Sequence, residues 1–352
     1  MTILVCTHND ADHAEGVIGF LESGLRCHEL WLPATWLDAL QSLPRRVEDT
    51  LHAVWERFYM LTPQWFVDDV SDGEHVVLEM AWQAMFPNFQ EMSSSQLIEQ
   101  QRRKYYRGRG TVSMSDMLGD VIDSLNKHLD ALSSSFEWPF GGAFGWPFEY
   151  SDPRDRWARC ILNDTERLLR LARLALDLGI PIRCLRHDPQ NANGVPGYPL
   201  RPLSARSVRY VRPPAARRGP DEFFALAALT VTNKESLVCY LDGEDWGCGV
   251  LFTADSNLDG IDLSRIHPLD IATAPHHGSA DNRGAYARIG KPMIWVRSDG
   301  YSKRRPCEEY LKALGQRFCT LCRNSSRGKQ AVRLYTWGGQ WEPRGSRRCQ
   351  CG

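Results

Sequence analysis

The sequence predicts a mixed α/β fold, and three observations support this prediction. Short apolar runs rich in β-branched residues recur towards both ends of the chain, with helical patterns between them. Three of these runs lead directly into His or Asp, at the position where open α/β sheets hold their ligands. The 352 residues include 43% hydrophobic and 24% charged residues, the composition of a globular protein with one large domain or two ordinary ones.

The N-terminal elements place a first cluster of His and Asp. Residues 2–6 (TILVC) predict a strand, 14–23 (AEGVIGFLES) a helix, and 28–33 (HELWLP) a second strand. The stretch CTHNDADHAEG at 6–16 supplies four candidate metal ligands, which are His8, Asp10, Asp12 and His13. We therefore expect this cluster on the loop between the first strand and the helix.

The middle of the chain has a different character. Residues 34–178 show helical periodicity interrupted by Pro, Gly and Ser, with an aromatic, glycine-rich loop at 136–153. This pattern predicts a large, mostly helical insertion.

Strand patterns return after the insertion. They cover 180–185, 236–242, 249–255, 270–277, 292–298 and 331–337, with a helix at 308–315 and a segment, 223–229, that fits either type. The predicted organisation is a core begun by 1–33, an insertion at 34–178, the remainder of the core at 179–340, and a cysteine-containing tail at 341–352.

Two of the later strands end as the first one does. LFTADSN presents Asp255 after an apolar run, and IATAPHHGS presents His276 and His277 after another. Imidazole and carboxylate are ligands for zinc, iron and manganese. Because loops at strand ends converge, the sequence predicts a metal site built from these separate segments.

In order and context, these motifs resemble those of metallo-β-lactamase-fold hydrolases. The family's first motif, H-x-H-x-D-H, is similar to His8-x-Asp10-x-Asp12-His13, and Gly16 follows it as in the family. The family's bridging aspartate matches Asp255, and its last histidine matches His276 or His277. The runs 232–256 and 270–279 are similar to the hydrolase domains of ComEC-like competence proteins.

The resemblance covers residues 1–33 and 180–340 and implies an αββα sandwich with two divalent metal ions. Zinc is the first expectation, with manganese or iron as alternatives because Asp10 replaces a histidine of the family pattern. The family's third histidine has four candidates, of which His187 is best placed because it follows a predicted strand; the others are His52, His75 and His128. Few residues precede the first motif, so we expect a short N-terminal sheet that a protein partner or a second copy completes.

The implied activity is hydrolysis by a metal-activated water, with Asp12 and Asp255 as catalytic residues and Ser279 as a substrate contact. The resemblance favours a phosphodiester substrate, either nucleic acid or a nucleotide. Two other functions stay open: a binding or scaffold subunit that has lost turnover, and a hydrolase of a small ester, lactone or thioester.

Charge and cysteine content bound the remaining possibilities. The net charge of −1 argues against a protein that binds nucleic acid over its whole surface. The N-terminus lacks a secretory pattern and no apolar run has membrane-spanning length, so we expect a cytoplasmic protein without a membrane partner. A structural zinc site is a further candidate, with ligands Cys319, Cys322, Cys349 and Cys351.

Overall fold

The computed structural model describes residues 2–36, 167–208 apart from 169, 173 and 176, 236–243, 247–298, 305–320, 331–346 and 348–351. Most of the predicted insertion, including His52, His75 and His128, lies outside these ranges, as do 223–229 and Cys322. The chain divides into two compact units, Met1–Cys184 with Val208–Asn233 and Leu185–Ser207 with Lys234–Gly352.

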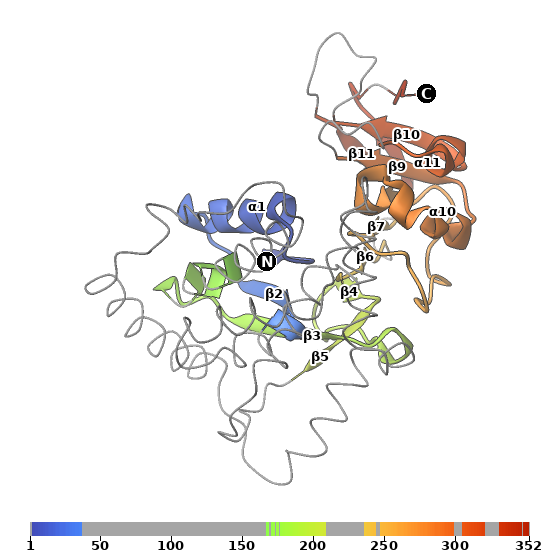
Figure 1. Cartoon of the computed structure of the whole chain (residues 1–352). Coiled ribbons are helices and arrows are strands. Elements are labelled where there is room, and N and C mark those ends of the chain that lie inside the picture. Colours follow the sequence, from blue (N-terminus) through green and yellow to red (C-terminus); the bar gives the residue numbers. More distant parts are fainter. Residues whose placement is uncertain are drawn as a thin grey trace, which may run out of the picture. The chain divides into compact units, whose positions relative to one another are not determined.

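Two N-terminal strands and two strands between residues 182 and 208 form a four-stranded sheet with the order β1-β2-β3-β5; Figure 1 labels β2, β3 and β5. Its strands are β1 (Ile3–Val5), β2 (Glu29–Pro33), β3 (Ile182–His187) and β5 (Ala205–Val208). β1 and β2 run parallel, with Leu4 opposite Leu30. A parallel pair needs a crossover connection, and helix α1 (Ala11–Glu22) supplies it.

Helix α1 has one apolar face, and that face is buried. Its buried residues recur at helical spacing, and they are Ala14, Val17, Ile18 and Leu21. They pack with Leu30 and Leu32 of β2 and with buried residues between 168 and 175, which belong to a second helical stretch. Gly24, with φ of 79°, ends α1 in the left-handed region that favours glycine.

The second sheet has six strands in the order β10-β9-β8-β7-β6-β4. The strands are β4 (Leu200–Pro202), β6 (Cys239–Leu241), β7 (Val250–Phe252), β8 (Ile271–Thr273), β9 (Met293–Arg297) and β10 (Gly315–Cys319). β7 to β10 run parallel, whereas β6 pairs antiparallel with β7 and with β4. A hairpin, β11 (Leu334–Trp337) and β12 (Gln340–Pro343), forms a separate two-stranded sheet.

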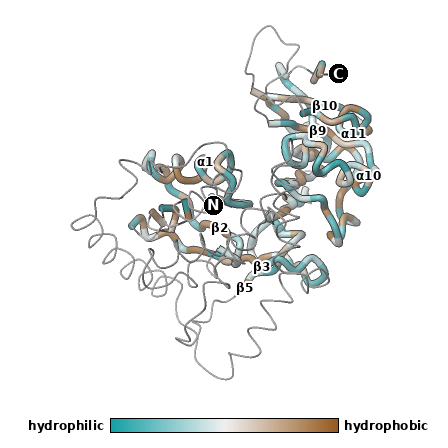
Figure 2. The backbone as a smooth tube through the Cα atoms, in the orientation of Figure 1, coloured by the Kyte–Doolittle hydropathy of each residue, from teal (hydrophilic) through white to brown (hydrophobic). Residues whose placement is uncertain are grey.

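Successive residues of the six-stranded sheet enter two different cores, as the side-chain alternation of a strand requires. Met293 and Trp295 of β9 pack with the short helices α10 (Gly284–Ile289) and α11 (Glu308–Lys312). Ile294 packs instead with Phe318 and with the β11–β12 hairpin. Both faces of the central parallel strands are therefore covered, which explains why these strands are apolar along their length; Figure 2 shows the hydropathy along the tube. Three 3-10 turns complete the described elements: Pro189–Asn191, Pro275–Gly278 and Ala280–Asn282.

These elements confirm a mixed α/β protein with parallel strands. The strand expectations at 2–6, 28–33, 236–242, 249–255, 270–277, 292–298 and 331–337 each contain a strand of the structure, and the expectation at 180–185 overlaps β3, which extends two residues further. The predicted helix at 14–23 begins three residues earlier, at Ala11, so Asp12 and His13 lie in its first turn rather than on the preceding loop. Among the described residues, no helix combines the length and the apolar character that crossing a bilayer requires.

Candidate metal centre

The loop after β1 carries the first group of candidate ligands. His8 is buried, with 3% of its surface exposed, and its Nε2 lies 3.8 Å from a carboxylate oxygen of Asp10. The His8 and His13 rings lie next to each other, with centroids 3.9 Å apart and ring planes tilted by 45°. The loop is held from outside as well, because the guanidinium of Arg167 donates to the carbonyl of Asn9 at 3.1 Å.

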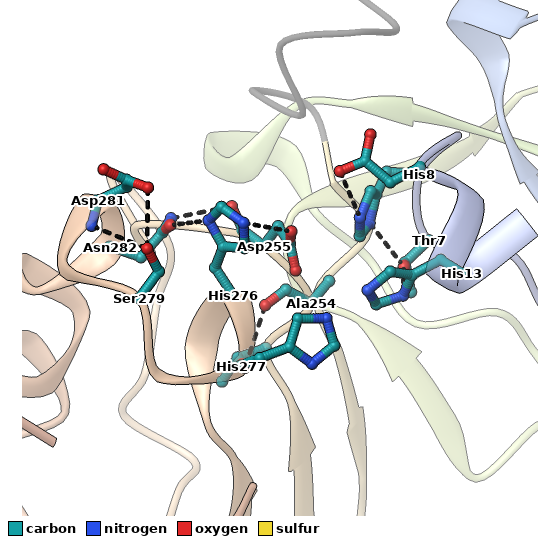
Figure 3. A network of polar contacts seen from close by, with 12 residues as sticks. Thr7, His8, His13, Ala254, Asp255, His276, His277, Ser279, Asp281 and Asn282 are labelled. Carbon is teal, nitrogen blue, oxygen red and sulfur yellow. Dashed lines mark hydrogen bonds and ion pairs between the residues drawn. The ribbon is translucent and has the colours of Figure 1, made fainter. Parts of the chain in front are cut away.

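Thr7 orients both imidazoles of this group. Its Oγ1 lies 2.9 Å from Nδ1 of His8 and 3.4 Å from Nδ1 of His13 (Figure 3). A hydroxyl donates only one proton, so at least one of the two rings carries its proton on Nδ1. In a neutral ring with that tautomer, Nε2 presents the lone pair that a metal ion requires.

The second group comes from loops that follow parallel strands. Asp255 follows β7, His276 and His277 follow β8, and Ser298 follows β9. Because parallel strands end at the same edge of the sheet, these residues share that edge. Thr253 and Thr273 connect the ends of β7 and β8, since the Thr253 hydroxyl donates to the Thr273 carbonyl at 3.0 Å.

Asn282 defines the protonation of His276. The side-chain amide of Asn282 donates to the Asp255 carbonyl at 2.9 Å, so its oxygen faces His276 and accepts from Nδ1 at 2.9 Å (Figure 3). A carbonyl oxygen fixes His277 in the same way, because its Nδ1 lies 2.6 Å from the carbonyl of Ser298. Both rings of the HH pair thus carry their proton on Nδ1 and present Nε2 as the donor atom, the arrangement usual for metal-binding histidines.

Two candidate ligand atoms of this group, from His276 and Asp255, face each other. Nε2 of His276 lies 3.4 Å from Oδ2 of Asp255, and both side chains are buried. With the Nδ1 proton engaged by Asn282, a lone pair and a carboxylate face each other in a low-dielectric setting. Such a pair is stable with a cation held between the two atoms or with a second proton on the imidazole. The donor set therefore fits a divalent metal ion.

Backbone strain concentrates at the same two loops. Among the described residues, five that are not glycine have positive φ, namely Ala254, Leu258, Leu269, His276 and His277. Ala254 (φ 47°) directly precedes Asp255, and the two histidines have φ of 44° and 53°. Each such residue costs about 1–3 kcal/mol and persists where the surrounding structure determines it, as at ligand sites. A hydrogen bond of 3.0 Å from the His276 N–H to the Ala254 carbonyl ties the two strained turns together.

Ser279, a predicted substrate contact, is 4% exposed. Its hydroxyl donates to a carboxylate oxygen of Asp281 at 2.8 Å and accepts from the Asp281 N–H at 3.3 Å. This side chain therefore holds the turn after the HH pair. A contact with substrate stays a prediction.

His187, the candidate for the third histidine, ends β3 and is mostly buried. Burial lowers its pKa from 6.5 to about 4, although the charge of Asp188 opposes this shift. Arg206 and Asn191 in turn engage the Asp188 carboxylate. His187 is thus a neutral imidazole at pH 7, and its role as a ligand stays a prediction.

Three of the four cysteines predicted as zinc ligands lie among the described residues. Cys319, Cys349 and Cys351 bring their sulfur atoms within 4.8 Å of one another. A hydrogen bond from the Cys319 thiol lowers the pKa of Cys349 to about 5, and burial opposes the shift. Cys322 lies outside the described residues.

Three residues that support these groups were not predicted from the sequence: Thr7, Asn282 and Arg297. Thr7 and Asn282 orient imidazoles, and Arg297 ends β9 beside the PHHG turn. A Cβ on Gly278 would lie 3.1 Å from Cδ of Arg297. Thr7 adjoins a ligand motif and Asn282 follows one by a few residues, but only the fold shows which ring nitrogen each of them meets.

Comparison of the chain with protein-family models, with curated proteins and with solved structures finds no match.

Proposed function

We propose that this chain is a metal-dependent hydrolase of the metallo-β-lactamase type, with two divalent ions and a phosphodiester as substrate. The observation that carries this proposal is the pairing of Nε2 of His276 with the Asp255 carboxylate at 3.4 Å, on a ring whose other nitrogen donates to Asn282. Both atoms are electron-pair donors, and they lie at the strand edge where α/β sheets hold ligands.

In this proposal the two histidine–carboxylate groups serve one centre. His8, Asp10, Asp12 and His13 from the N-terminal motif would hold the ions together with Asp255 and one histidine of the HH pair, as the family resemblance implies. Zinc, manganese or iron in such a set acidifies water near neutral pH and neutralises charge on the substrate oxygen.

The protein side chains then have separate tasks. The Nδ1 hydrogen bonds of His276 and His277 hold the rings at fixed angles, which saves the entropy of orienting them on binding. Asp255, held at its carbonyl by Asn282, provides negative charge beside His276. Asp12 lies in the first turn of α1, and we propose that its carboxylate orients the attacking water.

The proposal is tested by hydrolysis of bis(4-nitrophenyl) phosphate and of DNA by chain reconstituted with zinc, manganese or iron. We expect His13→Ala and Asp255→Ala to lose turnover and bound metal together. The exposed residues His28 and Asp259 provide matched controls, and their Ala variants should keep both properties.

Two results would count against the proposal. Fully metal-loaded chain without turnover on any ester would favour the scaffold function instead. Turnover of a lactone or thioester with none of a phosphodiester would keep the metal chemistry and replace the substrate class.

A further inference from the structure

A second donor cluster lies at the C-terminal end of β10, and it contains sulfur instead of imidazole. Cys319 is the last residue of β10, while Cys349 and Cys351 belong to the tail. All three Sγ atoms lie within 4.8 Å of one another. Cys319 and Cys351 are 0% and 7% exposed, and Cys349 is partly buried.

The backbone explains why the sulfurs of Cys319 and Cys349 meet. Arg348 forms an antiparallel bridge with Phe318, and the Cys349 N–H donates to the Arg317 carbonyl at 2.6 Å. Cys319 and Cys349 are the neighbours of the bridged pair Phe318 and Arg348, so their side chains share the face opposite to that pair. Residues 349–351 form no strand, and the tail places Sγ of Cys351 beside the other two sulfurs.

The surroundings of the cluster suit thiolates. The Arg297 side chain is 1% exposed, and its guanidinium donates to Sγ of Cys351 at 3.6 Å. The Cys351 N–H approaches Sγ of Cys349 at 3.4 Å. N–H donors of this kind stabilise sulfur ligands in metal sites and orient them.

We propose that Cys319, Cys349 and Cys351 form a thiolate site for a zinc ion, separate from the histidine–carboxylate centre. Zinc–sulfur bonds of about 2.3 Å in a tetrahedron separate the sulfurs by about 3.8 Å, within the span observed here. Three thiolates and a divalent cation sum to one negative charge, which the buried guanidinium of Arg297 balances. The cluster therefore accommodates a buried ion without leaving net charge.

The site has a structural consequence that follows from Arg297. This residue ends β9 and also faces Gly278 of the PHHG turn, so a metal held by the three thiols would fix the tail, β10 and the end of β9 together. This proposal uses none of the ligands of the first centre, and it stands whether or not the chain is a hydrolase.

Cobalt is the probe that separates the two centres. We expect the purified, reduced full chain to develop sulfur-to-cobalt charge-transfer absorption that saturates at one Co²⁺ per chain. The absorption should persist in Asp255→Ala, whose substitution affects only the oxygen and nitrogen donors. It should be lost in Cys351→Ser, while Cys239→Ser, a buried thiol of β6, serves as the matched control and keeps it.

A measurement on the unaltered chain covers the case in which Cys351→Ser fails to fold. Titration of zinc-loaded chain with a mercurial reagent should release one zinc per chain to a colorimetric chelator, in step with modification of the three thiols. The proposal is overturned by the absence of charge-transfer absorption in the wild type, by its persistence in a folded Cys351→Ser, or by a disulfide within the cluster together with no thiol-linked zinc.

Discussion

Truncation of Asn282 should weaken metal binding, although the Asn282 side chain is not itself a proposed metal ligand. Asn282 is 6% exposed and joins two parts of the candidate centre, accepting from Nδ1 of His276 at 2.9 Å and donating to the Asp255 carbonyl at 2.9 Å. Asn282→Ala removes both bonds and leaves a buried N–H and a buried carbonyl without the amide. We expect the free energy of unfolding to fall by about 2–6 kcal/mol, the cost of two such groups.

The effect on metal should be larger than a loss of stability explains. Without the amide oxygen the His276 ring can rotate and change tautomer, so we expect metal affinity to drop about 10- to 100-fold. Asn282→Asp keeps an acceptor for Nδ1 and should recover part of that affinity. Isothermal titration with Zn²⁺ measures the affinity, and urea denaturation of metal-free chain measures the stability.

Asn191 supplies the matched control, because it is an exposed asparagine whose amide donates to the Asp188 carboxylate. Asn191→Ala should leave metal affinity unchanged. If Asn282→Ala loses stability as expected but binds metal as tightly as the wild type, the assignment of Nε2 of His276 as a ligand atom is wrong.

Three further predictions concern the same framework. Gly278→Ala should lower the free energy of unfolding by about 1–3 kcal/mol, because φ is 84° and the new Cβ would lie 3.1 Å from Cδ of Arg297. Gly19→Ala, inside α1 with open space around the new Cβ, should raise the free energy of unfolding by up to about 1 kcal/mol. Urea denaturation of the two variants and the wild type measures both changes. His187 has a folded-state pKa of about 4 against 6.5, so between these values the unfolded chain binds a proton that the folded chain excludes. Stability in chelator should therefore fall as pH drops from 6.5 to 4, by up to about 3 kcal/mol. His187→Gln should remove this slope and the exposed His28→Gln should not; an unchanged slope in His187→Gln contradicts the buried environment. Asp270, 1% exposed, accepts from the Gly249 N–H, the Tyr240 hydroxyl and the His267 N–H. Asp270→Asn should lower the free energy of unfolding by about 1–3 kcal/mol, because the new NH₂ group must face one of these donors. An unchanged melting temperature would contradict this prediction.

Sequence patterns predicted the parallel strands well because these strands are buried on both faces. In β9 (MIWVR) the first four residues are apolar whichever of the two cores they enter, so the apolar run that predicts a strand is continuous. The sequence does not predict β10 (GQRFC), because this strand begins with glycine and carries polar residues. It is the edge strand of the six-stranded sheet, where polar side chains are tolerated. The sequence also places the start of α1 three residues too late. Asp10 adopts the extended backbone of an N-cap without a side-chain capping bond, so no capping signal marks the true start at Ala11.

The candidate ligands could be predicted, but their orientation could not. His276 and His277 follow an apolar run, which the sequence shows directly. The tautomer of each ring depends on Asn282 and Ser298, which only the fold brings beside them. Likewise, the Cys-x-Cys tail was visible in the sequence, but its approach to Cys319 depends on the bridge between Arg348 and Phe318.

The proposed function requires that the N-terminal motif and the strand-end group hold the same metal ions, as the family resemblance implies. Electron paramagnetic resonance counts bound Mn²⁺, an ion that prefers oxygen and nitrogen donors and avoids the thiol cluster. Bound Mn²⁺ should be measured in wild type, His13→Ala, Asp255→Ala and the double variant. A shared centre predicts that each single variant loses the same manganese and that the double variant loses no more. If each single variant loses a different ion and the losses add in the double variant, the two groups are separate sites and the claim is contradicted.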